Sequence, residues 1–137
     1  MIRDLSLCML GDLLSPDEIT NALNILPHRQ KFKNELVTNV SNKPIFAKTG
    51  RWSWNAISAP ELSFDDQLME FDDVFKESIL KLVDLPNVSN IWLDFCLIDD
   101  NTKGYNSFLL SAESLAIISK TRLPTKFTVY NSQSDAE

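Results

Sequence analysis

The chain has 137 residues, 44% of them hydrophobic and 23% charged, which is typical of one globular domain with a single core. Nineteen acidic and thirteen basic residues give a formal net charge of −6, which disfavours the phosphate contacts that dominate nucleic-acid binding. Opposite charge speeds the association of proteins. We therefore expect no binding of DNA or RNA, and a basic protein as the partner.

The amino terminus lacks the features of a signal peptide. Its apolar stretch at residues 5–10 is short, follows Asp4 and is interrupted by Gly11 and Asp12. No window approaches the roughly 18 to 20 apolar residues that span a bilayer. Cys8 and Cys96 lie in apolar runs, where free cysteines behave as small buried hydrophobes. These features predict a cytoplasmic protein with reduced cysteines in its core and no contact with membranes.

The first elements are predicted from apolar patterns and their boundaries. Residues 5–10 read as a buried strand that a turn follows. Ser15 then caps a helix, Pro16 fits its first turn, and Glu18 is placed to return a bond to the cap amide. Apolar residues keep the helical period up to Pro27.

Residues 28–48 are polar and irregular, and only a strand around 36–40 is predicted there. A strand follows at residues 51–57, in which Trp52 and Trp54 alternate with polar residues and so share one face. We expect that face to pack in the core. The alternative is a ligand or interface surface, because tryptophan is common at interface hot spots.

The most regular helical pattern runs from residue 64 to residue 84. Its apolar residues recur at steps of three and four along one face: Phe64, Leu68, Phe71, Phe75, Ile79 and Leu82. A second buried strand is predicted at 91–98, followed by a turn at 99–104 and a hairpin partner at 105–110. Ser111 then caps a third helix that runs to Lys120, and residues 126–130 form a final strand.

These elements predict an α+β fold, with an antiparallel sheet and helices mainly on one face. From Arg51 onward the order reads βαββαβ, as in ferredoxin-like folds, and an extra strand-helix unit precedes it. We expect one domain over residues 1–130 and a disordered tail over 131–137.

Several of these segments resemble the uncharacterised bacterial family known as domain of unknown function 4279. They are residues 11–20 (GDLLSPDEIT), residues 23–27, the strand around Trp54, Leu110-Ser111 with the helix that follows, and residues 127–130. The family pattern has glycine where this chain has Asn24, and a Lys-Gly pair where it has Lys33-Asn34. The resemblance implies an α+β fold without an assigned catalytic motif.

Acidic residues form a stripe on the helix predicted over 64–84, opposite its apolar face. We predict that this stripe binds the partner through Asp65, Asp66, Glu70, Asp73 and Glu77. A basic toxin domain, for instance a nuclease with a positive substrate site, would fit such a surface. The alternative is an ordinary solvated helix face, with acids near the positive end of the helix and lysines near the negative end.

Other residue types offer little chemistry. Asp94, Asp99 and Asp100 could hold a cation, although turn formation explains the last two better. His28 is the single histidine and is expected in a solvated loop, so histidine triads and two-histidine metal sites are excluded. The glycines are isolated, which gives no support to nucleotide binding. We predict no catalytic residue, metal or cofactor.

The sequence therefore favours a non-enzymatic protein-binding protein, most specifically a bacterial immunity protein that neutralises a basic, nuclease-like toxin domain. Small acidic proteins often play that part, which is an analogy. The protein is expected to be a monomer or a weak homodimer. Two alternative functions stay open. One is a scaffold subunit that self-associates through an exposed strand edge or the tryptophan face. The other is a small hydrolase that uses carboxylates such as Asp94 and Asp99.

Overall fold

The computed structural model describes residues 2–40, 43–99 and 107–131. The helices are α1 (Pro16–Leu23), α2 (Phe64–Phe75), the 3₁₀ helix η1 (Ile79–Asp84) and α3 (Ala112–Thr121). The strands are β1 (Ile2–Gly11), β2 (Arg29–Lys31), β3 (Leu36–Val40), β4 (Lys43–Phe46), β5 (Gly50–Asn55), β6 (Asn90–Asp99) and β7 (Thr125–Asn131). Among the helices of these ranges, none has the length and apolar character to cross a membrane.

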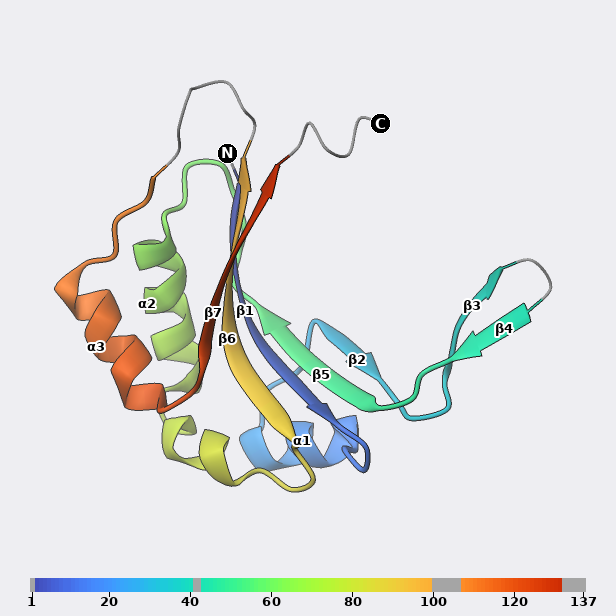
Figure 1. Cartoon of the computed structure of the whole chain (residues 1–137). Helices are drawn as coiled ribbons and strands as arrows, with labels where there is room; N and C mark the ends of the chain where they lie inside the picture. Colours follow the sequence, from blue (N-terminus) through green and yellow to red (C-terminus); the bar gives the residue numbers. More distant parts are fainter. Residues whose placement is uncertain (1, 41–42, 100–106, 132–137) are drawn as a thin grey trace.

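Five strands form one sheet in the order β2-β5-β1-β6-β7. All neighbouring strands are antiparallel except β6 and β7, which are parallel. Helices α2 and α3 cover one face of this sheet, and the hairpin of β3 and β4 projects from the other side (Figure 1). The predicted α+β fold, with a largely antiparallel sheet and helices mainly on one face, is confirmed.

The side chains of the central strand alternate between the two faces of the sheet. Leu5, Leu7 and Met9 are fully buried on the helix side, whereas Asp4 and Ser6 point to the opposite face, as strand geometry requires. We call that opposite face the open face. Trp52 and Trp54 of β5 are 0% and 4% exposed, and Trp54 makes edge contacts with Phe71 and Phe75 of α2.

The tryptophan face therefore belongs to the core, as the alternation of residues predicted. Within the same chain, α2 covers Trp54, and the indole of Trp52 donates to the hydroxyl of Thr20 on α1. Self-association through the tryptophan face, which the sequence left open, is excluded by this burial.

The helix predicted over residues 64–84 is broken into two elements. Its apolar face is confirmed, since Phe64, Leu68 and Phe71 are at most 1% exposed. The α-helix nevertheless ends at Phe75, and bonds of the i to i−3 type replace the helical ladder around Ser78. The hydroxyl of Ser78 donates to the carbonyl of Leu23 at the end of α1. Serine competes for backbone partners in this way, which the apolar period does not reveal.

The helix boundaries show both confirmed and wrong predictions. Ser111 caps α3 by accepting from the amide of Ser114 at 3.0 Å, as expected. Ser15 occupies the N-cap position of α1 with Pro16 after it, but its side chain makes no cap hydrogen bond. The capping box predicted with Glu18 is therefore wrong. The helix also ends at Leu23, before Leu26, which is 78% exposed.

The predicted ferredoxin-like order fails at its second hairpin. Residues 107–110 form no strand; Tyr105, Asn106 and most of the expected turn lie outside the described residues. The amide of Ser111 instead donates to the carboxylate of Asp65 on α2, which holds this segment against the helix layer. From β5 onward the described order is therefore β-α-β-α-β, and α3 supplies the crossover that the parallel pair β6–β7 needs.

Three asparagines adopt the left-handed backbone conformation: Asn24, Asn34 and Asn87. Two of them matter for the resemblance, namely Asn24, at the end of α1, with φ of 57°, and Asn34, before β3, with φ of 68°. Both stand where the pattern of the resembled family has glycine. Asparagine is the residue that best replaces glycine at positive φ. These departures therefore keep the loop conformation that glycine would give.

Asn24 offers a direct test of this backbone requirement. Replacing Asn24 with alanine should lower the free energy of unfolding by about 1 kcal/mol, because alanine pays a steric penalty at positive φ. Replacing it with glycine should leave stability within about 0.5 kcal/mol of the parent protein. Urea unfolding of the two variants measures both effects. Equal stability of both would contradict the assignment.

Gln67 of α2 ties the helix layer to the central strand. It is 1% exposed. Its Oε1 accepts from the amide of Leu5 at 2.7 Å and its Nε2 donates to the carbonyl of Arg3, also at 2.7 Å. The pairing of β1 with β5 begins only at Ser6. Gln67 therefore satisfies backbone groups of β1 beyond the reach of the β5 ladder.

Gln67→Met should lower the free energy of unfolding by about 1–3 kcal/mol, because it leaves the buried amide of Leu5 without a partner, whereas the Arg3 carbonyl keeps the hydroxyl of Ser58. Met69→Gln on the exposed side of the same helix is the control and should change stability by less than about 0.5 kcal/mol. Chemical denaturation compares the two variants. A loss near that of the control would show that water replaces the side chain.

Candidate functional site

The acidic stripe predicted as the binding surface lies mostly on α2, but its members have different surroundings. Asp66 and Asp73 are exposed on the helix, and Glu77 is exposed just beyond its end. Asp65 and Glu70 are half-buried. The break after Phe75 thus places Glu77 in the turn that leads to η1, so the stripe is shorter than the sequence period implied.

Two of these acids hold local structure. Asp66 forms a capping box with Ser63, in which the hydroxyl of Ser63 accepts from the amide of Asp66 and the Asp66 carboxylate accepts from the amide of Ser63. The carboxylate of Glu70 accepts from the amide of Ile57 at 2.8 Å, which fastens the loop after β5 to the helix. Changing either residue would disturb the fold as well as the charge.

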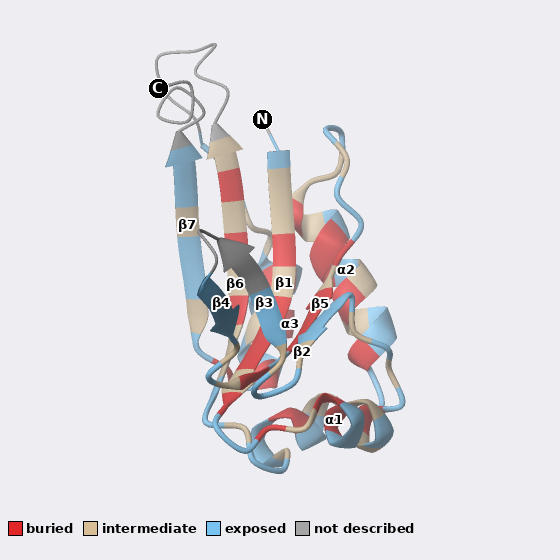
Figure 2. Cartoon of the chain, turned by 90° about the vertical axis from the view of Figure 1, so that its right-hand side faces the viewer, coloured by how far each residue is buried: buried red, intermediate tan, exposed pale blue. Residues whose placement is uncertain are grey.

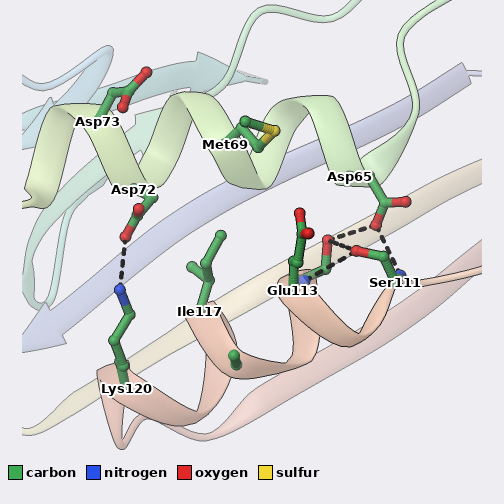
Figure 3. Close-up of a pocket in the computed structure, with 10 residues that line it drawn as sticks. Asp65, Met69, Asp72, Asp73, Ser111, Glu113, Ile117 and Lys120 are labelled. Atoms are coloured by element: carbon green, nitrogen blue, oxygen red, sulfur yellow. Dashed lines mark hydrogen bonds and ion pairs between the residues drawn. The ribbon is translucent and has the colours of Figure 1, made fainter.

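Asp65 lies in a groove between α2 and α3 of about 490 Å³. Its Oδ1 accepts from the amide of Ser111 at 3.0 Å and from the hydroxyl of Ser114. At the other end of the groove, Lys120 forms an ion pair with Asp72 at 3.3 Å. Figure 3 shows these two polar links with Met69 and Ile117 between them. The groove is thus closed at both ends by contacts between the helices.

The hydrogen bonds from Ser111 and Ser114 lower the pKa of the Asp65 carboxyl. These donors stabilise the ionised form. Asp65 is therefore a clamp between α2 and α3, a role that the acidic stripe alone did not predict. The signal in the sequence was the Ser-x-x-Ser pattern at the start of α3, whose cap hydroxyls can bond to a second helix.

Asp73 and Glu77 lie at a second hollow of about 490 Å³, formed where the end of α2 meets the end of α1. Both carboxylates are exposed, and no hydrogen bond or ion pair joins either of them to another described residue. Lys76 and Lys81 line the same hollow. Of the five predicted contact residues, Asp73 and Glu77 are therefore the two whose charge is free for an outside partner.

Charge is separated between two regions of the molecule. Residues 61–84, which include α2 and η1, carry eight acidic and two basic residues, a formal charge of −6 that equals the net charge of the whole chain. Residues 28–54, which include β2 to β4 and all but the last residue of β5, carry six basic residues and one acidic residue. These segments lie on opposite sides in Figure 1. The protein is thus strongly dipolar, which the net charge does not reveal.

The open face carries a polar hollow of about 590 Å³ that the sequence did not predict. Its lining comes from β1, β2, β5 and β6, and mixes both signs of charge: Asp4, Ser6, Cys8, His28, Arg29, Gln30, Lys31, Arg51, Ser53, Asn55 and Asp94. The alternating polar residues of β1 were the available signal. His28, predicted as a solvated loop residue, is exposed, and its Nδ1 accepts from the amide of Asn55 at 3.0 Å.

The groups in this hollow are not arranged for nucleophilic chemistry. Burial raises the pKa of the Cys8 thiol, and the negative charge of Asp94 adds to that effect. A thiol with a raised pKa stays protonated and is a weak nucleophile at neutral pH. Burial likewise raises the pKa of Asp4, which Arg29 partly offsets. Both cysteines are free; Cys8 is buried, but it lies on the open face and not in the main core, and Cys96 is half-buried.

The carboxylates considered for a metal or a hydrolase lie largely outside the described residues. Asp94 lies on the open face beside Ser6; the side chain of Asp99 and the whole of Asp100 lie outside the described residues. Within the described part, no cluster of three histidine, cysteine or acidic residues could hold a metal ion. The indole nitrogen of Trp92 and Oδ1 of Asp94 are buried without described partners, so β6 is the least satisfied strand on this face.

The Asp65 clamp makes a prediction about pH. Because its folded pKa lies below the ordinary value of 3.8, ionised Asp65 stabilises the fold above that value, and the contribution disappears as the pH falls through the folded pKa. Asp65→Asn should therefore be less stable than the parent at pH 7. The difference should shrink at about pH 3. Urea unfolding at both pH values tests this, with Asp73→Asn as the control.

If the clamp depends on shape alone, the free energies of unfolding of the parent and of Asp65→Asn should differ by the same amount at both pH values. That outcome would contradict a role for the carboxylate charge. The Asp73→Asn control should match the parent at pH 7, since Asp73 makes no described hydrogen bond.

Comparisons with known proteins give one match. No curated protein and no solved structure matches the chain. The family model described as "Domain of unknown function (DUF4279)" matches residues 2–132, which is almost the whole chain and includes every described element. The segments that carried the resemblance in the sequence lie within this range. The chain belongs to the DUF4279 family.

Proposed function

We propose that this protein is a non-enzymatic binding domain that docks a basic protein on the acidic surface of α2. The observation that carries the proposal is the separation of charge, which concentrates a formal −6 in residues 61–84. Such a field attracts a basic surface and repels an acidic one. Asp73 and Glu77, the two freely exposed acids of the stripe, would be the contact residues, and Asp66 would add charge beside them.

An immunity protein that covers the positive substrate site of a nuclease-like toxin is the most specific form of this proposal. A nuclease must keep its substrate site positive to bind phosphates. A compact acidic helix has the charge that is complementary to such a site. The size and overall charge of the chain support this reading. The basic region at residues 28–54 lies on the other side of the molecule, so it would not oppose such a partner at α2.

Reversing the charge of Asp73 and Glu77 alone tests the proposal with less effect on the fold than reversing the whole stripe. Asp73→Lys combined with Glu77→Lys removes no described hydrogen bond and should leave stability nearly unchanged. The affinity for the partner should fall at least about tenfold, because charges at protein interfaces couple by roughly 1.5–7 kcal/mol when they are close. Asp12→Lys combined with Glu18→Lys makes the same change in net charge elsewhere on the surface and is the matched control.

The experiment captures partners from the native lysate with the parent, the double variant and the control, at low and high salt, and identifies them by mass spectrometry. Isothermal titration then measures the affinity of the captured protein for all three. A basic protein that binds the parent and the control, but not the Asp73/Glu77 variant, would support the proposal. Equal binding to all three, or an acidic partner, would contradict it.

A further inference from the structure

The two edges of the five-stranded sheet differ sharply. One edge is β2, which has three residues, Arg29, Gln30 and Lys31. Short, charged edge strands resist pairing with other chains. The other edge is β7, which has seven residues and pairs with β6 on one side alone within the described chain. One edge is therefore protected, and the other presents a row of backbone donors and acceptors.

The side chains of β7 are unusually apolar for an uncovered edge. Phe127, Val129 and Tyr130 are 52%, 63% and 56% exposed. Figure 2 shows β7 as the outer strand, with exposed residues along most of its length. A long edge with apolar side chains is a template for the addition of another strand. We therefore expect another strand to pair with β7.

We propose that this strand is the β7 strand of a second copy, so that two sheets join into one across a twofold axis. The most common oligomers are twofold dimers, in which one patch contacts itself. The pattern of β7 is self-complementary in this sense. If two β7 strands pair antiparallel about Thr128, Phe127 lies opposite the partner subunit's Val129, and Lys126 lies opposite the partner subunit's Tyr130.

This register pairs compatible side chains on each face. Phe127 and Val129 both lie on the helix side, because they pair with Phe95 and Leu97 of β6, which are buried there. The two copies would thus form an apolar group of four side chains, a favourable cross-strand arrangement. On the open face, Lys126 would meet an aromatic ring, which also attracts a cation.

Charge does not oppose a twofold contact at this edge, although the molecule carries a net −6. Residues 125–130 contain one basic residue, Lys126, and no acidic residue, so two copies would meet here with little repulsion. Helix α2 is tied to β1 through Gln67, and β6 lies between β1 and the edge strand β7. Strand pairing alone buries less than the roughly 1,200 Å² of stable interfaces. The dimer is accordingly weak and depends on concentration.

Sedimentation velocity of the full chain from about 1 µM to about 1 mM, the range in which weak interfaces associate, tests the proposal. The parent should shift from monomer to dimer. Val129→Lys should weaken association about tenfold or more, because it places two like charges on neighbouring positions of the joined strands. Val83→Lys, at an apolar residue of η1 that is 49% exposed, is the matched control and should dimerise as the parent does.

A charge swap sharpens the test. Val129→Lys and Val129→Glu should each be monomeric alone, and a mixture of the two should dimerise, because position 129 of one copy neighbours position 129 of the other in this register. Hydrogen exchange of the parent should show protection of β7 amides that rises with concentration, while β2 is unchanged. A monomer at all concentrations, or a dimer unaffected by Val129→Lys, would overturn the proposal.

Discussion

The central strand β1 and the side chain that completes its hydrogen bonding organise this protein. Leu5, Leu7 and Met9 are fully buried beneath the helix layer, and β1 pairs with β5 on one side and β6 on the other. Where β5 ends, Gln67 of α2 takes over the amide of Leu5 and the carbonyl of Arg3. A single glutamine thus fixes the position of α2 along the sheet, because its bond to the Leu5 amide is buried and cannot be exchanged for water without cost.

The position of α2 in turn determines what its acids can do. Phe64, Phe71 and Phe75 are buried against the sheet. Their burial determines the direction in which every other side chain of the helix points. Asp65 faces α3 and clamps it, while Glu70 holds the loop at Ile57. Only the remaining side of the helix end, with Asp73 and Glu77, is left for a partner. Three of the five residues of the apparent binding stripe are therefore structural, and the proposed contact is smaller and nearer to α1 than the stripe.

The features that depend on local periodicity could be predicted from the sequence, and those that depend on distant contacts could not. The alternation around Trp52 and Trp54 and the apolar face of α2 follow from strand and helix geometry, and both are confirmed. The break at Ser78 depends on the carbonyl of Leu23, fifty-five residues earlier, and the absence of a strand at 107–110 accompanies a bond between Ser111 and Asp65. The polar hollow of the open face brings together residues from four strands. The pattern of a single segment cannot predict such a hollow.

The two proposed surfaces are independent and can act together. The acidic end of α2 lies in the helix layer and β7 is the outer edge of the sheet. The two differ in chemistry, since one is charged and the other is apolar with one lysine. A twofold dimer through β7 would carry two acidic surfaces related by the same axis. A partner with two basic sites would then bind with a gain set by effective concentration and not by new contacts. A monomeric partner would bind each acidic surface alone, so it would neither require the dimer nor disturb it, because nothing in its recognition involves the sheet edge.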